Sequence, residues 1–176
     1  MGHVGEDPPC ALKPVELADL YAQYPSLEGS DHRITSKDND AYNCVAWVPR
    51  EFDRWYEPGM YWPPGIPEPP ERPDIECYEA LFGSWGFERC ADPAYEAGFL
   101  KISVYGRGDH FCHVAKQIRG GGWSSKGGVL HDFRHASLDA LHPCGIMENA
   151  RPAFFMRRAD DGSDPQHLER TGIIPA

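Results

Sequence analysis

The sequence predicts an α+β domain in which N-terminal helices pack on a small antiparallel β-sheet. Apolar residues recur at helical spacing in the first half of the 176-residue chain, over residues 14–24, 44–56 and 74–87. The second half changes to apolar runs typical of strands, separated by glycine-rich turns, over residues 98–106, 111–118 and 123–126. Strands joined by short connections pair antiparallel, so these three are expected to form a meander.

The first two helices have recognisable starts. Pro14 opens the first, because proline fits the first helical position, where its missing N–H is not needed. The second begins near Cys44, after the polar residues Asp38, Asn39 and Asp40, any of which is a candidate N-cap. We expect it to continue to about residue 56, with Pro49 kinking it or ending it early.

A proline-rich loop separates the second helix from the third. Residues 57–73 hold seven prolines in seventeen positions, which excludes a regular helix or a central strand. Tyr61 and Trp62 are aromatic residues through which the loop can pack on the rest of the domain. The loop then either forms the wall of a groove or is a surface loop held in place by these two residues. Asp74 is the candidate N-cap of the third helix, and Gly83 is expected to end it.

The rest of the chain predicts one further helix and one further strand. A short helix is expected over residues 137–145 and a last strand over 152–159. The length favours a single domain spanning residues 1–176, with the polar ends 1–13 and 160–176 at its periphery.

Charge and composition exclude several classes of function. The net charge is −10, from 17 basic and 27 acidic residues, so we expect no nucleic-acid partner. No segment is long and apolar enough for a membrane span, and the N-terminus shows no export signal. We therefore expect a cytoplasmic protein with mostly reduced thiols, or an effector secreted by another route.

The six cysteines do not predict a metal site. None of them forms a CxxC pair, which disfavours a zinc ribbon or a thioredoxin-type site. Within the segment HFCH, strand alternation would put His110 and Cys112 on one face and His113 on the other. We expect no metal and no cofactor. A metal-dependent hydrolase remains the weakest alternative, with His110, Cys112, His131 and His135 as ligands.

One cysteine and one histidine form a candidate catalytic pair. Cys44 lies where the polar segment SKDND turns into an apolar helix, and a helix N-terminus favours the nucleophilic thiolate. His113 is the best candidate base, since a strand on the sheet can hold its ring near that helix. Imidazolium and helix dipole would together stabilise the thiolate. The alternative is structural: Cys44 as a core residue, and His113 as a buried histidine with satisfied hydrogen bonds.

The layout resembles the papain-like superfamily of cysteine peptidases and amidases, in particular its NlpC-type and CHAP-type branches. Residues 38–48 (DNDAYNCVAWV) look like the nucleophile helix, and residues 113–123 (HVAKQIRGGGW) are similar to the histidine strand, glycine turn and return strand. The similarity covers about residues 36–126. The Asn-Cys-x-Ala-Trp segment and a later Trp-x-Ser-Lys also resemble small uncharacterised bacterial proteins.

The resemblance implies a third polar group that orients the histidine, and an oxyanion hole. Ser125 or Ser124 falls where the family has a histidine, an asparagine or another polar residue on the following strand, and Asp132 or His131 is the alternative. A serine orients imidazole less strongly than a carboxylate or an amide does. The backbone N–H of Cys44 is one candidate oxyanion donor, and the side chain of Asn43 is a candidate for the second.

Two functions follow from these expectations. The first is a cysteine hydrolase or acyltransferase acting on an amide bond, with a peptide, an isopeptide, a side-chain amide or a small amide as substrate. The alternative is a binding module with the same fold and no catalysis, such as an immunity or accessory protein. Its acidic surface would suit a basic protein partner.

Overall fold

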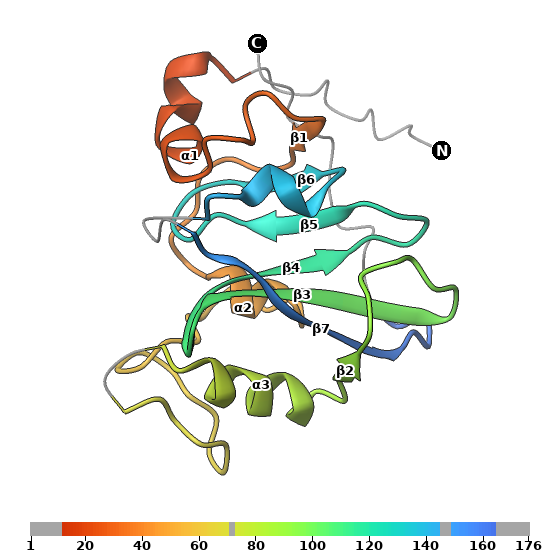
Figure 1. Ribbon diagram of the computed structural model, residues 1–176. Coiled ribbons are helices and arrows are strands. Elements are labelled where there is room, and N and C mark those ends of the chain that lie inside the picture. The colour runs from red at the N-terminus through yellow and green to blue at the C-terminus, as the bar shows by residue number, and fades with distance from the viewer. Residues whose placement is uncertain (1–11, 71–72, 145–148, 165–176) are drawn as a thin grey trace, which may run out of the picture.

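A seven-stranded antiparallel sheet forms the centre of the molecule, in the order β1-β6-β5-β4-β3-β7-β2 (Figure 1). The computed structural model describes residues 12–70, 73–144 and 149–164. Few and short helices accompany the sheet within these residues. The predicted α+β class is confirmed, and the sheet is larger than expected.

The central strands follow the predicted meander and extend it. Consecutive antiparallel pairing joins β3 (Phe99–Arg107), β4 (His110–Gln117), β5 (Trp123–Lys126) and β6 (Asp132–His135). The predicted last strand is β7 (Arg151–Ala159), which pairs with β3 on the side away from β4. Two short edge strands were not predicted, β1 (His32–Ile34) on β6 and β2 (Glu88–Cys90) on β7.

The helices agree with the predicted positions but are shorter. The first comprises a 3-10 turn, η1 (Pro14–Leu17), and α1 (Ala18–Gln23). The others are α2 (Cys44–Trp47), α3 (Ile75–Ser84) and the 3-10 turn η2 (Leu138–Leu141). Asp74 caps α3 as predicted, with its side chain accepting a hydrogen bond from the Glu76 N–H.

The second helix does not continue to residue 56 as the sequence predicts. It ends at Trp47 because Pro49 has no N–H to donate into a following turn. Arg50 then adopts a positive φ of 64°, a left-handed conformation that helices do not use. The chain leaves the helix after a single turn, and the apolar residues that follow pack from a loop.

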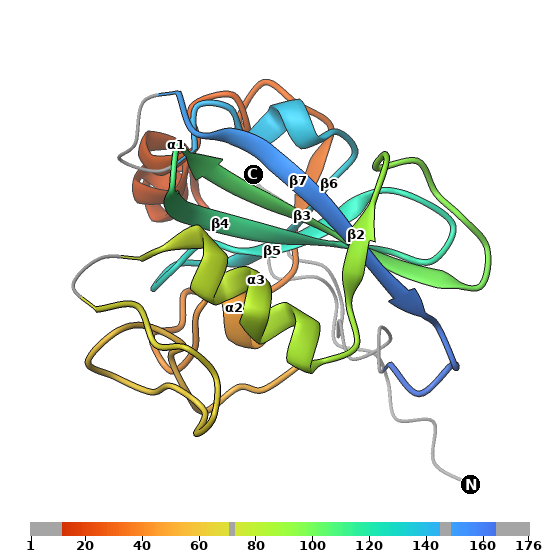
Figure 2. The ribbon, with the colours of Figure 1, turned by 60° about the horizontal axis from the view of Figure 1, so that its bottom comes forward.

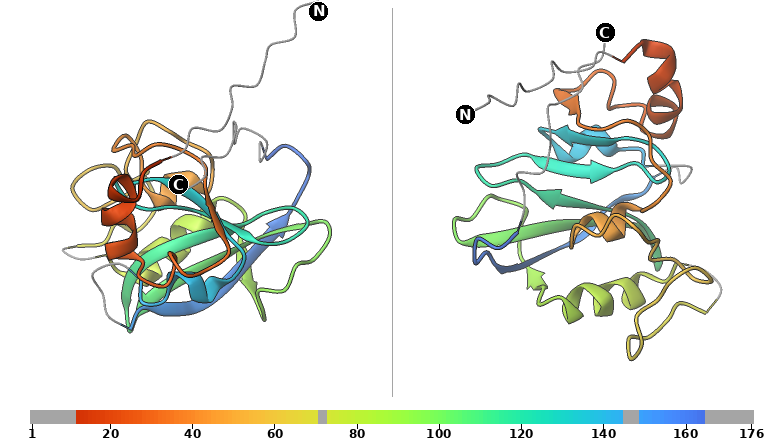
Figure 3. Two further views of the ribbon diagram at one scale, coloured as in Figure 1. Left: turned by 90° about the horizontal axis from the view of Figure 1, so that it is seen from above. Right: turned by 180° about the vertical axis from the view of Figure 1, so that it is seen from behind.

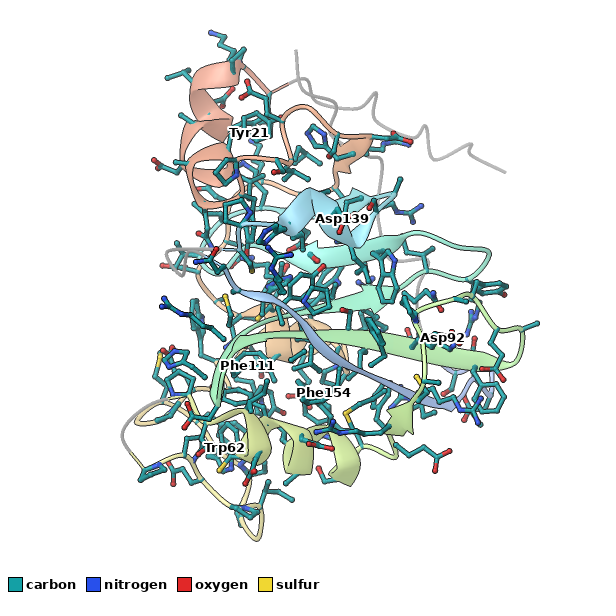
Figure 4. All side chains as sticks on the ribbon, viewed as in Figure 1. Tyr21, Trp62, Asp92, Phe111, Asp139 and Phe154 are labelled. Carbon is teal, nitrogen blue, oxygen red and sulfur yellow. The ribbon has the colours of Figure 1, made fainter. Side chains whose placement is uncertain are left out.

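Apolar side chains fill two cores, one on each face of the sheet. The first lies under α2, α3 and the proline-rich loop, which Figure 2 shows together on one side of the sheet. In the side-chain view, Phe111 and Phe154 lie between the sheet and α3 (Figure 4). The second core lies under α1 and η2 and includes Tyr24, Tyr105 and Phe133. The view from behind shows α1 at the end of the sheet that holds β1 and β6, and α2 beside the central strands (Figure 3).

The proline-rich loop is packed through its aromatic residues. The Trp62 ring meets Tyr78 of α3 edge-on at 5.1 Å, and the Tyr61 ring meets Tyr56 at 5.2 Å between ring centroids. These contacts hold the described part of the loop against the first core. Loop residues 71 and 72 lie outside the described residues.

The described residues after β7 are tied to the sheet by ion pairs. Asp160 binds Arg119 through two hydrogen bonds of 2.7 Å. Asp164 is buried and lies 2.7 Å from the ammonium group of Lys116 in β4. Residues 160–164 therefore contact the framework directly, whereas 165–176 and 1–11 lie outside the described residues. In the described part of the chain, no helix has the length and apolar character needed to cross a membrane.

Candidate functional site

The helix that carries Cys44 is capped by the residue before it. Asn43 accepts hydrogen bonds through Oδ1 from the N–H groups of Ala46 and Tyr56, at 3.2 and 3.4 Å. Its amide nitrogen donates to the Tyr56 carbonyl at 3.2 Å. One buried amide thus fixes the start of α2 and anchors the chain that returns after it. Cys44 becomes the first residue of the helix.

The Cys44 sulfur lies against β4. It accepts a hydrogen bond from the backbone of Val114, the residue that follows His113. The side chain is 8% exposed. Burial raises the pKa of the Cys44 thiol to about 12, and the hydrogen bond from Val114 opposes that shift only in part. The resting sulfur is therefore a protonated thiol at neutral pH.

A β-bulge changes which side chains of β4 share a face. The ladder with β3 pairs Tyr105 with His113 and then Gly106 with Phe111, so Cys112 is an extra residue. Simple alternation predicts that Cys112 points away from His113. That expectation is wrong, because the bulge lets Cys112 and His113 line the same pocket.

The His113 ring is buried between two tyrosines. Its centroid lies 5.8 Å from the Tyr24 ring and 5.7 Å from the Tyr105 ring, both edge-on. The histidine is 1% exposed. Aromatic contacts on both sides restrict the ring to one orientation, which a general base requires.

Hydrogen bonds connect His113 to a second histidine through a serine. Nε2 of His113 lies 3.1 Å from Oγ of Ser125, and the same oxygen lies 2.9 Å from Nε2 of His135. Nδ1 of His135 lies 2.8 Å from the Ser137 carbonyl oxygen. The chain of contacts therefore ends on a group that can only accept.

This end point fixes the direction of every hydrogen bond in the chain. Because a carbonyl accepts, Nδ1 of His135 carries a proton, and Nε2 of the neutral ring is an acceptor. Ser125 then donates to His135 and accepts from Nε2–H of His113. Nδ1 of His113 is left without a proton, so it is the basic nitrogen of the ring.

Both histidines are neutral in the folded protein. Burial lowers the pKa of His113 to about 3, with a smaller contribution from the neighbouring His135. Burial also lowers the pKa of His135 to about 4. The expected thiolate–imidazolium pair is therefore not the resting state, because desolvation disfavours both charges.

Cys44 and His113 line one pocket of about 150 Å³ near the start of β4. Its walls combine α1, the start of α2, the proline-rich loop and the bulged part of β4. Aromatic side chains contribute much of the surface, with Cys112 beside the pair. The lining aromatic residues are Tyr24, Trp55, Tyr78 and Phe111.

The other predicted site residues lie elsewhere or have structural partners. Asp132 is on the opposite face of its strand from Phe133, and its carboxylate accepts a 2.7 Å hydrogen bond from Tyr42. Ser124 accepts from the Trp47 indole N–H at 3.1 Å. The bond between Trp47 and Ser124 joins α2 to β5.

The Asn43 side chain, the candidate second oxyanion donor, lines the pocket with Cys44. Its amide nitrogen donates one hydrogen bond to the Tyr56 carbonyl, and the residue is 7% exposed. Among the described residues, no group of three or more histidines, cysteines or acidic residues is arranged to hold a metal ion.

Sequence reasoning missed His135 as a member of this site. The strand that carries it contains Asp132 and Arg134, whose charges hide the alternation of a buried strand. The available signal was the turn-forming segment KGGVLHD, which returns the chain beside β5. Ser125 pairs with Phe133 across these strands, so His135 is its diagonal neighbour on the same face.

The chain belongs to a family described as a domain of unknown function (DUF7689), whose model matches residues 33–146. The match includes Cys44, His113, Ser125 and His135. No curated protein and no solved structure matches the chain.

Proposed function

We propose that the protein is a cysteine hydrolase or acyltransferase that acts on an amide bond, with Cys44 as nucleophile and His113 as base. The observation that carries the proposal is the shared pocket. A thiol and a neutral imidazole line it together, and hydrogen bonds through Ser125 leave Nδ1 of that imidazole free of a proton. A nucleophile, a base and an orienting group are the parts that covalent catalysis needs.

The first chemical step is attack with proton transfer. Because the resting thiol and imidazole are both neutral, Nδ1 of His113 removes the Cys44 proton as the sulfur attacks the carbonyl carbon. The imidazolium that forms keeps its Nε2–H on Ser125. This mechanism favours a substrate whose carbonyl is already reactive or tightly held, since no preformed thiolate is present.

The second step expels the amine. The N–H of Cys44 belongs to the first turn of α2, whose amides have no acceptor within the helix, so it is suited to bind the oxyanion. The tetrahedral intermediate collapses when His113 returns its proton to the leaving nitrogen. A thioester on Cys44 remains. Water hydrolyses it, or an acceptor amine attacks it and receives the acyl group.

The pocket restricts the substrate. Its volume of about 150 Å³ suits a group the size of one amino-acid side chain and is small for a whole drug-sized ligand. The aromatic walls favour an apolar acyl group next to the scissile bond. A peptide, an isopeptide or a side-chain amide enters by its end, with the rest of the substrate outside.

The arrangement is compatible with a papain-like core of the NlpC or CHAP type. A cysteine at the start of a helix and a histidine on an antiparallel sheet support that assignment. Ser125 occupies the strand position that the resemblance gives to the orienting group. The departures are a helix of one turn and a serine in place of an amide, imidazole or carboxylate.

Acyl capture tests the proposal. The protein is incubated with p-nitrophenyl acetate, digested with trypsin, and searched for an acetyl group on residues 38–50, which contain Cys44 as their only cysteine. We expect acetylation there, none in Cys44→Ala, and normal acetylation in Cys77→Ala. Acetylation spread evenly over the cysteines, or unchanged labelling of residues 38–50 in His113→Ala, would reject the proposed chemistry.

A binding module without catalysis is the second candidate. The burial of Cys44 and its raised pKa favour it, because an inert core cysteine has the same properties. In that case the acidic protein would recognise a basic partner through its surface charge. Absence of acetylation at Cys44 together with unchanged folding of Cys44→Ala supports this candidate.

A further inference from the structure

A second pair of sulfur atoms lies beside the pocket. The Cys112 and Cys144 sulfurs are 3.4 Å apart, and the Cys112 sulfur is also 3.3 Å from the Cys144 carbonyl oxygen. Cys112 is the extra residue of the β4 bulge, and Cys144 follows η2 in the chain. The five cysteines among the described residues are free thiols, so this pair is in its reduced form.

The two thiols differ in the way that thiol–disulfide exchange requires. Cys112 is partly exposed and lines the pocket, whereas Cys144 is 1% exposed in the second core. A hydrogen bond between the sulfurs lowers the pKa of Cys112 and raises that of the more deeply buried Cys144. The accessible sulfur is therefore the better nucleophile, and the buried sulfur is close enough to react second.

We infer that Cys112 and Cys144 form a reversible disulfide by exchange with a low-molecular-weight disulfide such as oxidised glutathione. The Cys112 thiolate attacks one glutathione sulfur, which forms a mixed disulfide and releases one glutathione thiolate. Cys144 loses its proton and attacks the Cys112 sulfur, which releases the second glutathione. Two protein thiols are oxidised and one glutathione disulfide is reduced to two glutathione molecules.

The structure favours closure over a lasting mixed disulfide. A disulfide bond is about 2.05 Å long, so the sulfurs need to approach from 3.4 Å. The bulge gives β4 an unpaired residue at Cys112, whose side chain moves with less disturbance of the ladder than a paired residue.

This inference goes beyond the proposed function, because it concerns other sulfur atoms and holds whether or not Cys44 reacts. Cys112 precedes His113 directly, so the disulfide would pin the bulge that carries the proposed base. Its formation is measured without any substrate for Cys44.

Peptide mapping in a glutathione redox buffer tests the inference. Trypsin releases Cys112 in residues 108–116 and Cys144 in residues 135–157, each as the only cysteine of its peptide. The folded protein is equilibrated with oxidised glutathione, its remaining thiols are blocked, and the digest is analysed by mass spectrometry. We expect these two peptides as a linked pair that dithiothreitol separates.

Two variants assign the roles, with Cys77→Ser as the matched control. Cys144→Ser should trap glutathione on residues 108–116, because the resolving thiol is gone, and Cys77→Ser should form the linked pair like the parent. Circular dichroism shows whether each variant is folded. Free thiols at both positions in the folded protein, or a lasting mixed disulfide on the parent, would overturn the inference. Glutathione trapped on Cys144 in Cys112→Ser as readily as on Cys112 would overturn the assigned order of attack.

Discussion

The Ser125 hydroxyl lies 3.1 Å from Nε2 of His113 and thereby sets which nitrogen of that ring is basic. A serine alone would leave the direction of this hydrogen bond open, since a hydroxyl both donates and accepts. His135 on the far side of the serine removes the ambiguity. The orienting group of His113 is therefore a serine together with a second histidine.

Removing the serine hydroxyl should weaken catalysis and leave the fold intact. In Ser125→Ala, His113 loses its partner, and we expect the rate of acetyl transfer to Cys44 to fall about tenfold to hundredfold. Ser124→Ala is the matched control, since Ser124 is buried and bonded to Trp47 on the other face. Stopped-flow release of p-nitrophenolate measures both rates. Equal rates in the two variants would contradict an orienting role for Ser125.

Asn43 should matter for stability and little for chemistry. Asn43→Ala removes the cap of α2 and the acceptor of the Tyr56 N–H, and it leaves the Tyr56 carbonyl with the Tyr78 hydroxyl as donor. We therefore expect a loss of about 2–4 kcal/mol in the free energy of unfolding. Asn39→Ala, which removes a similar bond at an exposed site, should cost under about 0.5 kcal/mol. Urea unfolding measures both. An unchanged stability of Asn43→Ala, with lost acetylation, would instead indicate an oxyanion donor.

The buried ion pair between Lys116 and Asp164 gives a third prediction. Asp164→Ala leaves a buried ammonium group with the Val48 carbonyl but no anion, so we expect a loss of about 3–5 kcal/mol. Asp160→Ala breaks the partly exposed pair with Arg119 and should cost about 1 kcal/mol or less. Thermal unfolding compares them. Similar losses of stability in the two variants would show that burial does not decide how much each ion pair contributes.

Stability should fall in acid because of the two buried histidines. Their folded pKa values, about 3 for His113 and about 4 for His135, lie below the ordinary value of about 6.5. Between these values the unfolded chain binds more protons than the folded chain, so the free energy of unfolding decreases as the pH falls below about 6.5. The stabilising contribution of the two neutral histidines is fully present above that pH. Asp132, with a pKa raised to about 6, acts in the opposite direction between about pH 4 and 6.

The pH profile of a variant checks this assignment. Urea unfolding of His113→Gln at several pH values should show a shallower decline than the parent, by up to one proton. A slope in His113→Gln equal to that of the parent would contradict a neutral buried His113.

The central strands and the cysteine helix could be predicted because their patterns are local. Period-two alternation and glycine turns mark β3, β4 and β5, and a polar run followed by apolar residues marks the start of α2. The edge strands β1 and β2 have three residues each, which is too short for a periodic signal. The length of α2 was overestimated because apolar residues after Pro49 pack from a loop.

The site was predictable only in part, because its geometry depends on strand register. The sequence suggested Cys44, His113 and Ser125, and the structure places a hydrogen bond between the last two. The bulge at Cys112 shifts the register by one residue, which no local pattern encodes. The position of His135 depends on pairing between β5 and β6, so its contact with Ser125 could not be read from spacing alone.

The rate at which iodoacetamide alkylates Cys44, compared between the parent and His113→Ala, tests the central claim most directly. Mass spectrometry of residues 38–50 follows the reaction at neutral pH, with Cys77 in the same sample as the reference. If His113 takes the Cys44 proton, the ratio of the Cys44 rate to the Cys77 rate should fall about 100-fold in the folded variant. An unchanged ratio would contradict the account and leave Cys44 as a core residue.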